Sequence, residues 1–465
     1  MKLSPLKSSS IIILITISII ILFICSSLRH ILFQSTGWDL ALFDQVVYLI
    51  SQGKYPISSF FKSHVLGDHA AFIFYPLALL YKIYPSVYWL FLVQAIALSI
   101  ASLPLYLLAK QANIKDNLAL TIVAVYLLYP LIFNINLFDF HAEVIALPAI
   151  FWAVLAARLK HFIQFIIATI LILSCKAVLS LTVAAMGIWL LLFEKRKKYG
   201  FFALVLGVFW FIITTQFIIP QFSESGVAAV GRYSFLGDSV TEIITNLFLQ
   251  PNIILSRLFT LANLGYIILV FIPVIWVLSP RYLAPLIPAI PTLTLNLLTD
   301  YQAQKDLLHQ YSIPILPFLL LSVIATLAAN KSLISKPKYI ITWSLICFLA
   351  LAKYGYFTSR YLQSIDTWKA TNEAISKIST QGNVLTSNYI APHLSQRAII
   401  KLAENGAESW DFDQFDYILL NQRHPGRESS PELIETIKEK VRQNTNFNLT
   451  YTKDDIYLFT QKTKQ

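Results

Sequence analysis

The chain has 465 residues, of which 56% are hydrophobic and only 13% are charged, and its formal net charge is +11. The apolar residues fall in runs of roughly 18 or more, the length that crosses a bilayer, so a soluble protein is excluded. Most of the excess Lys and Arg lies in short loops between apolar runs, where such residues orient a chain in the membrane. The positive charge therefore indicates lipid bilayer contact and not nucleic acid as a partner.

The first segment resembles a secretory signal, because MKLSPLK is basic and an apolar run follows from Ile11 to Cys25. That run is long for a signal peptide and is not followed by a convincing cleavage site. We expect a retained first helix with the N-terminus in the cytoplasm. The cysteines lie in or at the edge of apolar runs without CxxC spacing, which favours a packing role.

We expect about eleven membrane-spanning helices. The segment 70–84, AFIFYPLALLYKIYP, is apolar but short and is interrupted by Pro76 and Lys82. If it crossed the bilayer, the basic stretch EKRKK at 194–198 would lie outside, so we place 70–84 as a re-entrant or interfacial helix in the first outer loop. The expected spans are 9–28, 87–109, 117–137, 143–159, 161–175, 177–193, 200–219, 257–278, 283–299, 310–329 and 339–357.

An odd number of spans puts the C-terminal end on the outer face of the cytoplasmic (inner) membrane. We therefore predict an all-α polytopic membrane bundle over 1–357 and a small extracytoplasmic α/β domain over 358–465. In the latter, helices are expected at TWKATNEAISKIS and PELIETIKEKVRQ and strands at GNVLTS and FDYILLN. A terminal hairpin is expected at LTYTKDDIYLFTQ, turning at Lys453 to Asp455.

Two aspartates are the candidate catalytic residues. Asp39 and Asp44 lie five residues apart in GWDLALFDQ, directly after the first helix and among apolar and aromatic residues. A partly desolvated carboxylate can have a raised pKa and act as a general base, or stay ionised beside a metal or a cation. The other interpretation is that Asp39 caps a helix next to the membrane. The sequence does not decide which aspartate is the base.

Two further outer loops carry acids and histidines that could orient an acceptor or a metal. GDHAAF holds Asp68 and His69, and DFHAE holds Asp139, His141 and Glu143. On a continuous helix His141 and Glu143 would point about 200° apart, so they could not chelate one ion together. No cofactor is certain; a divalent metal stays open, with His69, His141 and Glu143 as candidate ligands.

Lys176 is the most informative basic residue. It lies in LSCKAVLSL, between two apolar spans at their expected outer ends, where the positive-inside rule disfavours lysine. A cation held there suits the phosphate of an anionic headgroup, and the alternative is a lysine that only reaches to the interface. Arg232 could add a second phosphate contact, and His309 and Tyr311 could contact phosphate or sugar.

The order of these motifs resembles that of known membrane enzymes. Acids in a long first outer loop, an interfacial helix and a polar outer face are typical of the glycosyltransferase C superfamily. More narrowly, the chain resembles a bacterial membrane family, the domain of unknown function 2079. The matching stretches are GWDLALFDQ, GDHAAFIFYPLALLYKIYPS, QAIALSIASLPLYLLAK, LFDFHAEVIALPAIF, HQYSIPILPFL and GNVLTSNYIAPHLSQR.

The resemblance implies a glycosyltransferase that takes a polyprenyl-phosphate sugar from the bilayer and transfers it to an acceptor that the sequence does not identify. Asp39 or Asp44 would accept the proton of the acceptor hydroxyl, and Lys176 would stabilise the departing phosphate. In the family the Lys176 segment continues with two acids, whereas here Ala177 and Val178 follow. The alternatives are a transporter or flippase of a lipid-linked glycan and a catalytically silent scaffold.

Overall fold

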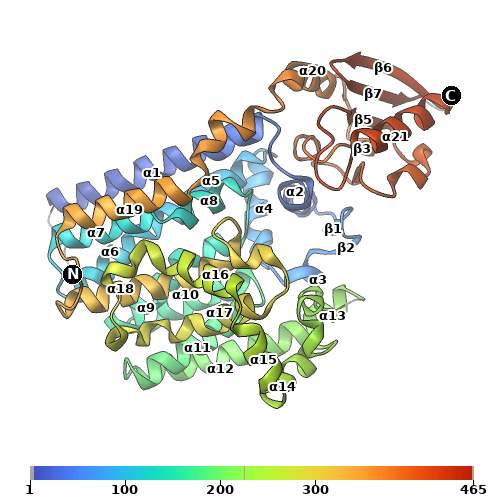
Figure 1. Cartoon of the computed structure of the whole chain (residues 1–465). Coiled ribbons are helices and arrows are strands. Elements are labelled where there is room, and N and C mark those ends of the chain that lie inside the picture. Colours follow the sequence, from blue (N-terminus) through green and yellow to red (C-terminus); the bar gives the residue numbers. More distant parts are fainter. Residues whose placement is uncertain (1–4, 225, 463–465) are drawn as a thin grey trace. The chain divides into compact units, whose positions relative to one another are not determined.

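The structure is a computed structural model that describes residues 5–224 and 226–462, and it divides into two compact units (Figure 1). The first, which we call the helical unit, comprises the chain up to Phe23, Leu66–Ile73 and Leu92–Tyr354. The second, the α/β unit, comprises Ile24–Val65, Phe74–Phe91 and the chain from Gly355. Each unit therefore draws on segments that are far apart in the sequence.

The helical unit consists of apolar helices, since a helix satisfies its own backbone hydrogen bonds where no water is present. Helices α1 (Pro5–Ile31) and α5 (Tyr88–Ile100) each contribute to both units. The others are α3 (Val65–His69), α6 (Ser102–Gln111), α7 (Asp116–Leu127), α8 (Pro130–Leu137), α9 (Glu143–Leu159), α10 (Phe162–Cys175), α11 (Leu179–Leu192), α12 (Lys197–Ile213), α13 (Ile219–Phe222), α14 (Val240–Leu249), α15 (Pro251–Leu258), α16 (Leu261–Phe271), α17 (Ile290–Leu298), α18 (Leu316–Ala328) and α19 (Pro337–Leu351).

Five helical stretches in the described residues are long and apolar enough to cross a membrane. They are Ser9–Ile31, Tyr88–Gln111, Asp116–Leu137, Lys197–Phe222 and Gln310–Ala328, and each coincides with an expected span. Two more expected spans are helix pairs bent by 63° and 44°, which raises the number to seven if each pair is one span. The expected spans at 161–175, 177–193 and 283–299 are shorter apolar helices, so the count of eleven stays a prediction.

Helices α11 and α12 pack closely along each other (Figure 1). A Cβ atom on Gly187 would lie 2.4 Å from the backbone N of Leu204, and one on Gly207 would lie 2.5 Å from that of Ala184. Glycines at these positions let the two backbones approach, as small residues do in many membrane helix pairs.

The α/β unit is built on a five-stranded sheet in the order β4-β3-β5-β7-β6. Strands β4, β3 and β5 are parallel; β7 pairs antiparallel with β5, and β6 pairs antiparallel with β7 at the edge. A two-stranded ribbon belongs to the first loop. The elements are α2 (Leu42–Ser51), β1 (Ile57–Ser58), β2 (Ser63–His64), α4 (Phe74–Ile83), α20 (Ile365–Ser376), β3 (Val384–Thr386), β4 (Ile400–Leu402), β5 (Tyr417–Asn421), α21 (Pro431–Gln443), β6 (Phe447–Lys453) and β7 (Ile456–Gln461).

Most elements expected in the C-terminal segment are confirmed. Helix α21 has the expected bounds, and the terminal hairpin turns at Asp454 and Asp455, whose φ angles of 49° and 60° are those of a tight hairpin turn. Strand β4 was missed, because its three residues lie in a stretch without clear alternation.

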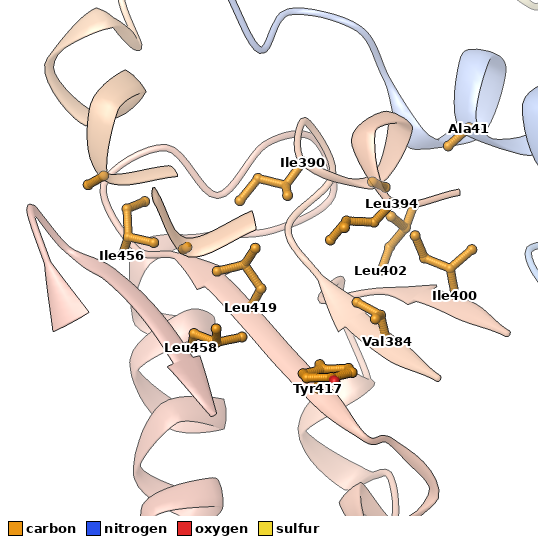
Figure 2. Packing of buried hydrophobic residues seen from close by; sticks show 13 residues of the cluster. Ala41, Val384, Ile390, Leu394, Ile400, Leu402, Tyr417, Leu419, Ile456 and Leu458 are labelled. Atoms are coloured by element: carbon orange, nitrogen blue, oxygen red, sulfur yellow. The ribbon is translucent and has the colours of Figure 1, made fainter. Parts of the chain in front are cut away.

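The sheet buries apolar side chains on both faces. Alternation along β5 sends Leu419 to the α20 side and Ile418 to the α21 side. Ala41, from the first loop, is part of the cluster on the α20 side (Figure 2). This loop and the sheet thus share one core.

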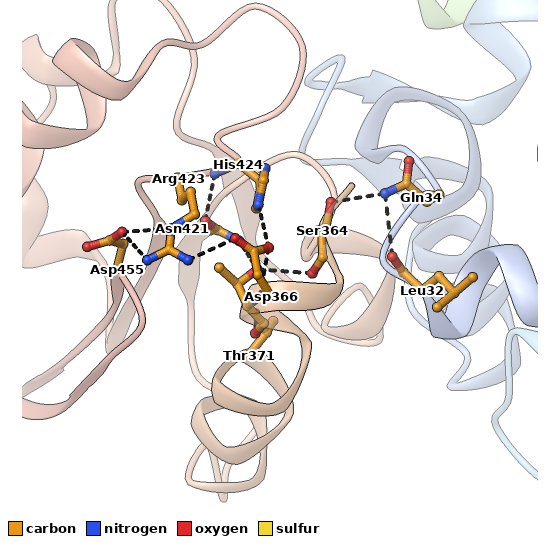
Figure 3. A network of polar contacts seen from close by, with 10 residues as sticks. Leu32, Gln34, Ser364, Asp366, Thr371, Asn421, Arg423, His424 and Asp455 are labelled. Atoms are coloured by element: carbon orange, nitrogen blue, oxygen red, sulfur yellow. Dashed lines mark hydrogen bonds and ion pairs between the residues drawn. The ribbon is translucent and has the colours of Figure 1, made fainter. Parts of the chain in front are cut away.

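Polar contacts attach the two ends of the α/β unit to each other (Figure 3). Gln34 donates to Ser364 Oγ at 3.0 Å across 330 positions of sequence. Beside it, Arg423 forms ion pairs with Asp366 at the start of α20 and with Asp455 at the hairpin turn. The start of α20 is therefore fixed to the sheet and to the segment that follows the first helix.

Candidate functional site

Asp39 lies in a π-helical turn, Gly37–Ala41, that leads into α2. Its carboxylate is partly exposed and accepts a hydrogen bond from Thr36 Oγ1 at 3.2 Å. π-Helical turns are rare and occur often at functional sites. The turn presents Asp39 at the surface of the α/β unit. The alternative that Asp39 caps a helix next to the membrane stays a prediction.

Asp44 has a different environment, because it is enclosed in the first turn of α2. Tyr81 Oη and Ser395 Oγ each donate to its carboxylate at 2.6 Å, and Gln396 Nε2 donates at 3.3 Å. Burial raises the pKa of Asp44 to about 6, although these donors oppose the shift. The three partners were missed from the sequence because two of them lie about 350 positions away.

Lys176 stands at the break between α10 and α11, where the chain is extended. Its ammonium contacts Glu143 Oε1 at 2.5 Å, and the two side chains are only 11% and 8% exposed. Glu143 begins α9, where the positive end of the helix also favours a carboxylate. From the sequence, Lys176 was expected to be a lone cation that either binds a phosphate or reaches to the interface. The structure instead pairs it with Glu143.

The turn that precedes Glu143 is held by Gln94 of α5. Gln94 Nε2 donates to the carbonyl of Asp139 at 2.7 Å, and Gln94 Oε1 accepts from the backbone N–H of His141 at 3.1 Å. The buried Asp139 has a φ of 72°, so this chain reversal uses a left-handed backbone. The His141 ring stacks on Phe138 with a centroid separation of 5.2 Å.

His69 joins the same group of residues from α3. Its carbonyl accepts a hydrogen bond from the N–H of Ala177 at 2.9 Å, which connects it to the residue after Lys176. Burial lowers the pKa of His69. The positive charge of Lys176 also lowers this pKa, whereas the carboxylates of Asp68 and Glu143 oppose the shift. Asp68 stays beside the ring, with 3.3 Å between its carboxylate and His69 Nε2.

His309 lies against the same turn, because its ring packs edge-on to Phe138 at 4.2 Å. Its Nδ1 contacts Asp306 Oδ2 at 2.7 Å. The guanidinium of Arg232 lies 4.7 Å from the ring of Tyr301 and 5.2 Å from that of Tyr311. This second cation is thus partly enclosed by aromatic rings.

The structure therefore sorts the candidate residues into two sets. The helical unit holds one set, which we call the Lys176 cluster: Asp68, His69, Asp139, His141, Glu143, Lys176, Arg232, His309 and Tyr311. The α/β unit holds Asp39 and Asp44. Sequence reasoning did not single out Gln94 or Asp306 as site residues, because a lone glutamine in an apolar span and a loop acid carry no specific signal.

Two further observations concern the residue after Lys176 and the candidate metal ligands. Ala177, the residue after Lys176, packs in an apolar cluster with Ala70 and Ile219. Among the residues described, no three His, Cys, Asp or Glu side chains are grouped so that they could hold a metal ion. The metal sites considered from the sequence stay predictions.

Known proteins resemble this chain in sequence and in fold. A family model described as "Predicted membrane protein (DUF2079)" matches residues 29–458. Two crystal structures of ArnT from Cupriavidus metallidurans are similar over 97% of this chain and 98% of theirs. The apo structure has a TM-score of 0.56 at 10% identity, and the structure bound to undecaprenyl phosphate has a TM-score of 0.52 at 9% identity. No curated protein matches.

Proposed function

Since the chain belongs to the DUF2079 family of membrane proteins and has the fold of ArnT, a member of the glycosyltransferase C superfamily, we propose that it is a membrane glycosyltransferase that uses a polyprenyl-phosphate-linked sugar. The observation that carries the proposal is the buried Lys176–Glu143 pair at the break between two apolar helices. Ion pairs of this kind are rare among apolar helices and commonly mark a substrate path.

The proposed reaction is a direct displacement at the anomeric carbon. The acceptor hydroxyl attacks this carbon, the bond from the carbon to the phosphate oxygen breaks, and the polyprenyl phosphate leaves with the bonding electrons. Asp39 takes the proton of the hydroxyl, since its partly exposed carboxylate is accessible to an acceptor. Asp44, whose carboxylate is already bound by three donors, instead anchors α2.

Lys176 and Arg232 are the proposed ligands of the donor phosphate. In this role Lys176 exchanges part of its contact with Glu143 for the phosphate oxygens, whose charge it neutralises as the leaving group forms. Glu143 keeps the lysine in place when no donor is bound. Asp68, His69, Asp139, His141, His309 and Tyr311 shape the surroundings in which the sugar or the acceptor is oriented.

The proposal includes the topology expected from the sequence, with the N-terminus in the cytoplasm and residues 358–465 outside as an extracytoplasmic domain. Cysteines introduced one at a time at the exposed positions Lys336 and Arg427 test this orientation, in a chain whose three native cysteines are replaced by serine. A membrane-impermeant maleimide should label Arg427→Cys in intact cells and Lys336→Cys only after permeabilisation. The opposite labelling pattern would show that the orientation is inverted.

The transferase activity is tested with purified protein in lipid nanodiscs, a panel of radiolabelled polyprenyl-phosphate sugars and a cell-envelope fraction as acceptor source. Asp39→Asn should lower the rate of label transfer by about 10²- to 10⁴-fold, the usual contribution of a general base. Asp238→Asn, which removes an exposed loop acid, is the matched control and should transfer normally.

Two results would contradict the proposal. Equal rates of sugar transfer by the wild type and Asp39→Asn would show that Asp39 is not the general base. Movement of intact donor across a vesicle bilayer, without transfer of its sugar, would favour the transporter.

A further inference from the structure

The segment that carries Asp39 is bound at one edge of the C-terminal sheet. Strands β3 and β4 are parallel, and Asn388 and Glu404 follow their carboxyl ends by two residues each. In open parallel sheets this edge is the usual place for a ligand, because the loops that leave the strands form a crevice there. In this chain the edge holds a piece of the protein itself.

Three side chains and one backbone group form a continuous hydrogen-bonded series at this edge. The backbone N–H of Gly37 donates to Asn388 Oδ1 at 3.1 Å, and Asn388 Nδ2 donates to Glu404 Oε1 at 3.0 Å. Trp38 Nε1 then donates to both carboxylate oxygens of Glu404, at 2.8 and 3.0 Å. Asn388 and Glu404 together thus bind the two residues that immediately precede Asp39.

Packing against strand β4 also confines the same turn. A Cβ atom on Gly37 would lie 2.8 Å from both methyl groups of Leu402, the last residue of β4. Ala41, which ends the π-helical turn, is fully buried in the core that Leu402 also joins. Gly37 and Ala41 are therefore held at both ends of the turn, and Asp39 lies between them.

We propose that Asn388 and Glu404 are positioning residues, which hold the Gly37–Ala41 turn so that the Asp39 carboxylate is fixed in the geometry for proton abstraction. This inference rests on the proposed function, in which Asp39 is the base, and it assigns the C-terminal domain a part in the reaction. A displaced turn would leave donor binding intact, since the proposed phosphate ligands belong to the helical unit.

The test combines hydrogen exchange with kinetics on the full chain in nanodiscs. In Asn388→Ala and Glu404→Ala, amide exchange at residues 36–41 should accelerate at least about tenfold, because Gly37 and Trp38 lose their tethers. The kcat for transfer should fall by about 10- to 100-fold with an unchanged KM for the donor, as expected when a catalytic group is misplaced by about 1 Å. Exchange in β5 should stay at the wild-type level.

Conservative and remote variants separate positioning from a general loss of structure. Glu404→Gln keeps one acceptor oxygen for Trp38 and should restore much of the kcat that Glu404→Ala loses. Asn448→Ala, at an exposed position of β6, and Glu439→Gln, on the open face of α21, should behave as wild type.

Wild-type exchange at 36–41 in both alanine variants, or wild-type kcat, would overturn the inference. A rise in KM with constant kcat would also overturn it, because Asn388 and Glu404 would then bind substrate. If the wild type transfers no sugar from any donor, the proposed function fails, and the exchange measurement alone shows whether these residues hold the turn.

Discussion

At the scale of residues, Asp39 and Asp44 show how two equally promising acids can differ. Both follow the first helix in an apolar stretch, and nothing in that stretch separates them. The structure gives Asp44 three donors inside the α/β unit, while Asp39 is partly exposed in a π-helical turn. A carboxylate that is already saturated with donors is suited to hold structure, and an accessible one is suited to take a proton.

The raised pKa of Asp44 predicts a pH dependence of stability. With a pKa of about 6 in the folded state and 3.8 as the ordinary value, the folded chain binds more protons than the unfolded chain between these pH values. Stability from this group therefore rises as pH falls, by about 1.4 kcal/mol between pH 7 and pH 5.

Asp44→Asn removes this titration. The thermal midpoint of the wild type in nanodiscs should increase relative to that of the variant when the pH is changed from 7 to 5. A difference between the two proteins that does not change with pH would show that Asp44 titrates normally.

The sequence predicted these acids, and also Lys176, because each is a charged residue where apolar residues dominate. Their partners could not be predicted in the same way. Ser395 and Gln396 are ordinary polar residues of a soluble segment, and their bonds to Asp44 span 351 and 352 positions. Only the folded chain brings such pairs together.

At the scale of elements, the helical unit depends on close helix contacts that hydropathy does not reveal. Gly187→Ala and Gly207→Ala would each place a methyl group within 2.6 Å of backbone atoms of the facing helix. Such overpacking costs about 1 to 3 kcal/mol, so both variants should unfold at lower temperature in detergent.

Gly265→Ala is the matched control, because Gly265 lies within α16 and a Cβ atom there meets nothing within 4 Å. This variant should be as stable as the wild type or slightly more stable, since alanine favours a helix over glycine. Equal stability of all three variants would contradict the close packing of α11 on α12.

Helix boundaries were predicted best where residues typical of a helix start mark them. The bounds of α21 follow from Ser430, which caps the helix, and Pro431, which begins it. The bends at 63° and 44° were not predicted, because a hydropathy pattern measures length and apolar content but not direction. The π-helical turn at Asp39 likewise has no sequence signature that we could use.

At the scale of the whole molecule, the chain builds each compact unit from separate segments. The first loop shares its core and its polar network with the C-terminal domain, so residues near the two ends of the chain form the surroundings of Asp39. The boundary at 357/358 follows chain order and stays a prediction. The proposed function depends on one property, that the chain binds a polyprenyl phosphate carrier.

Carrier binding tests this claim most directly, because it requires neither the sugar nor the acceptor to be known. The measurement is saturable binding of radiolabelled undecaprenyl phosphate to the protein in nanodiscs. Lys176→Met alone would leave Glu143 buried without its partner, which costs about 3 to 5 kcal/mol. The informative variant is therefore Lys176→Met combined with Glu143→Gln, with Lys115→Met at an exposed position as control.

We predict saturable binding by the wild type and by Lys115→Met, and binding at least about tenfold weaker by the double variant, because the phosphate loses its charge-assisted contact. Binding that is absent in the wild type, or equally strong in the double variant, would contradict the account.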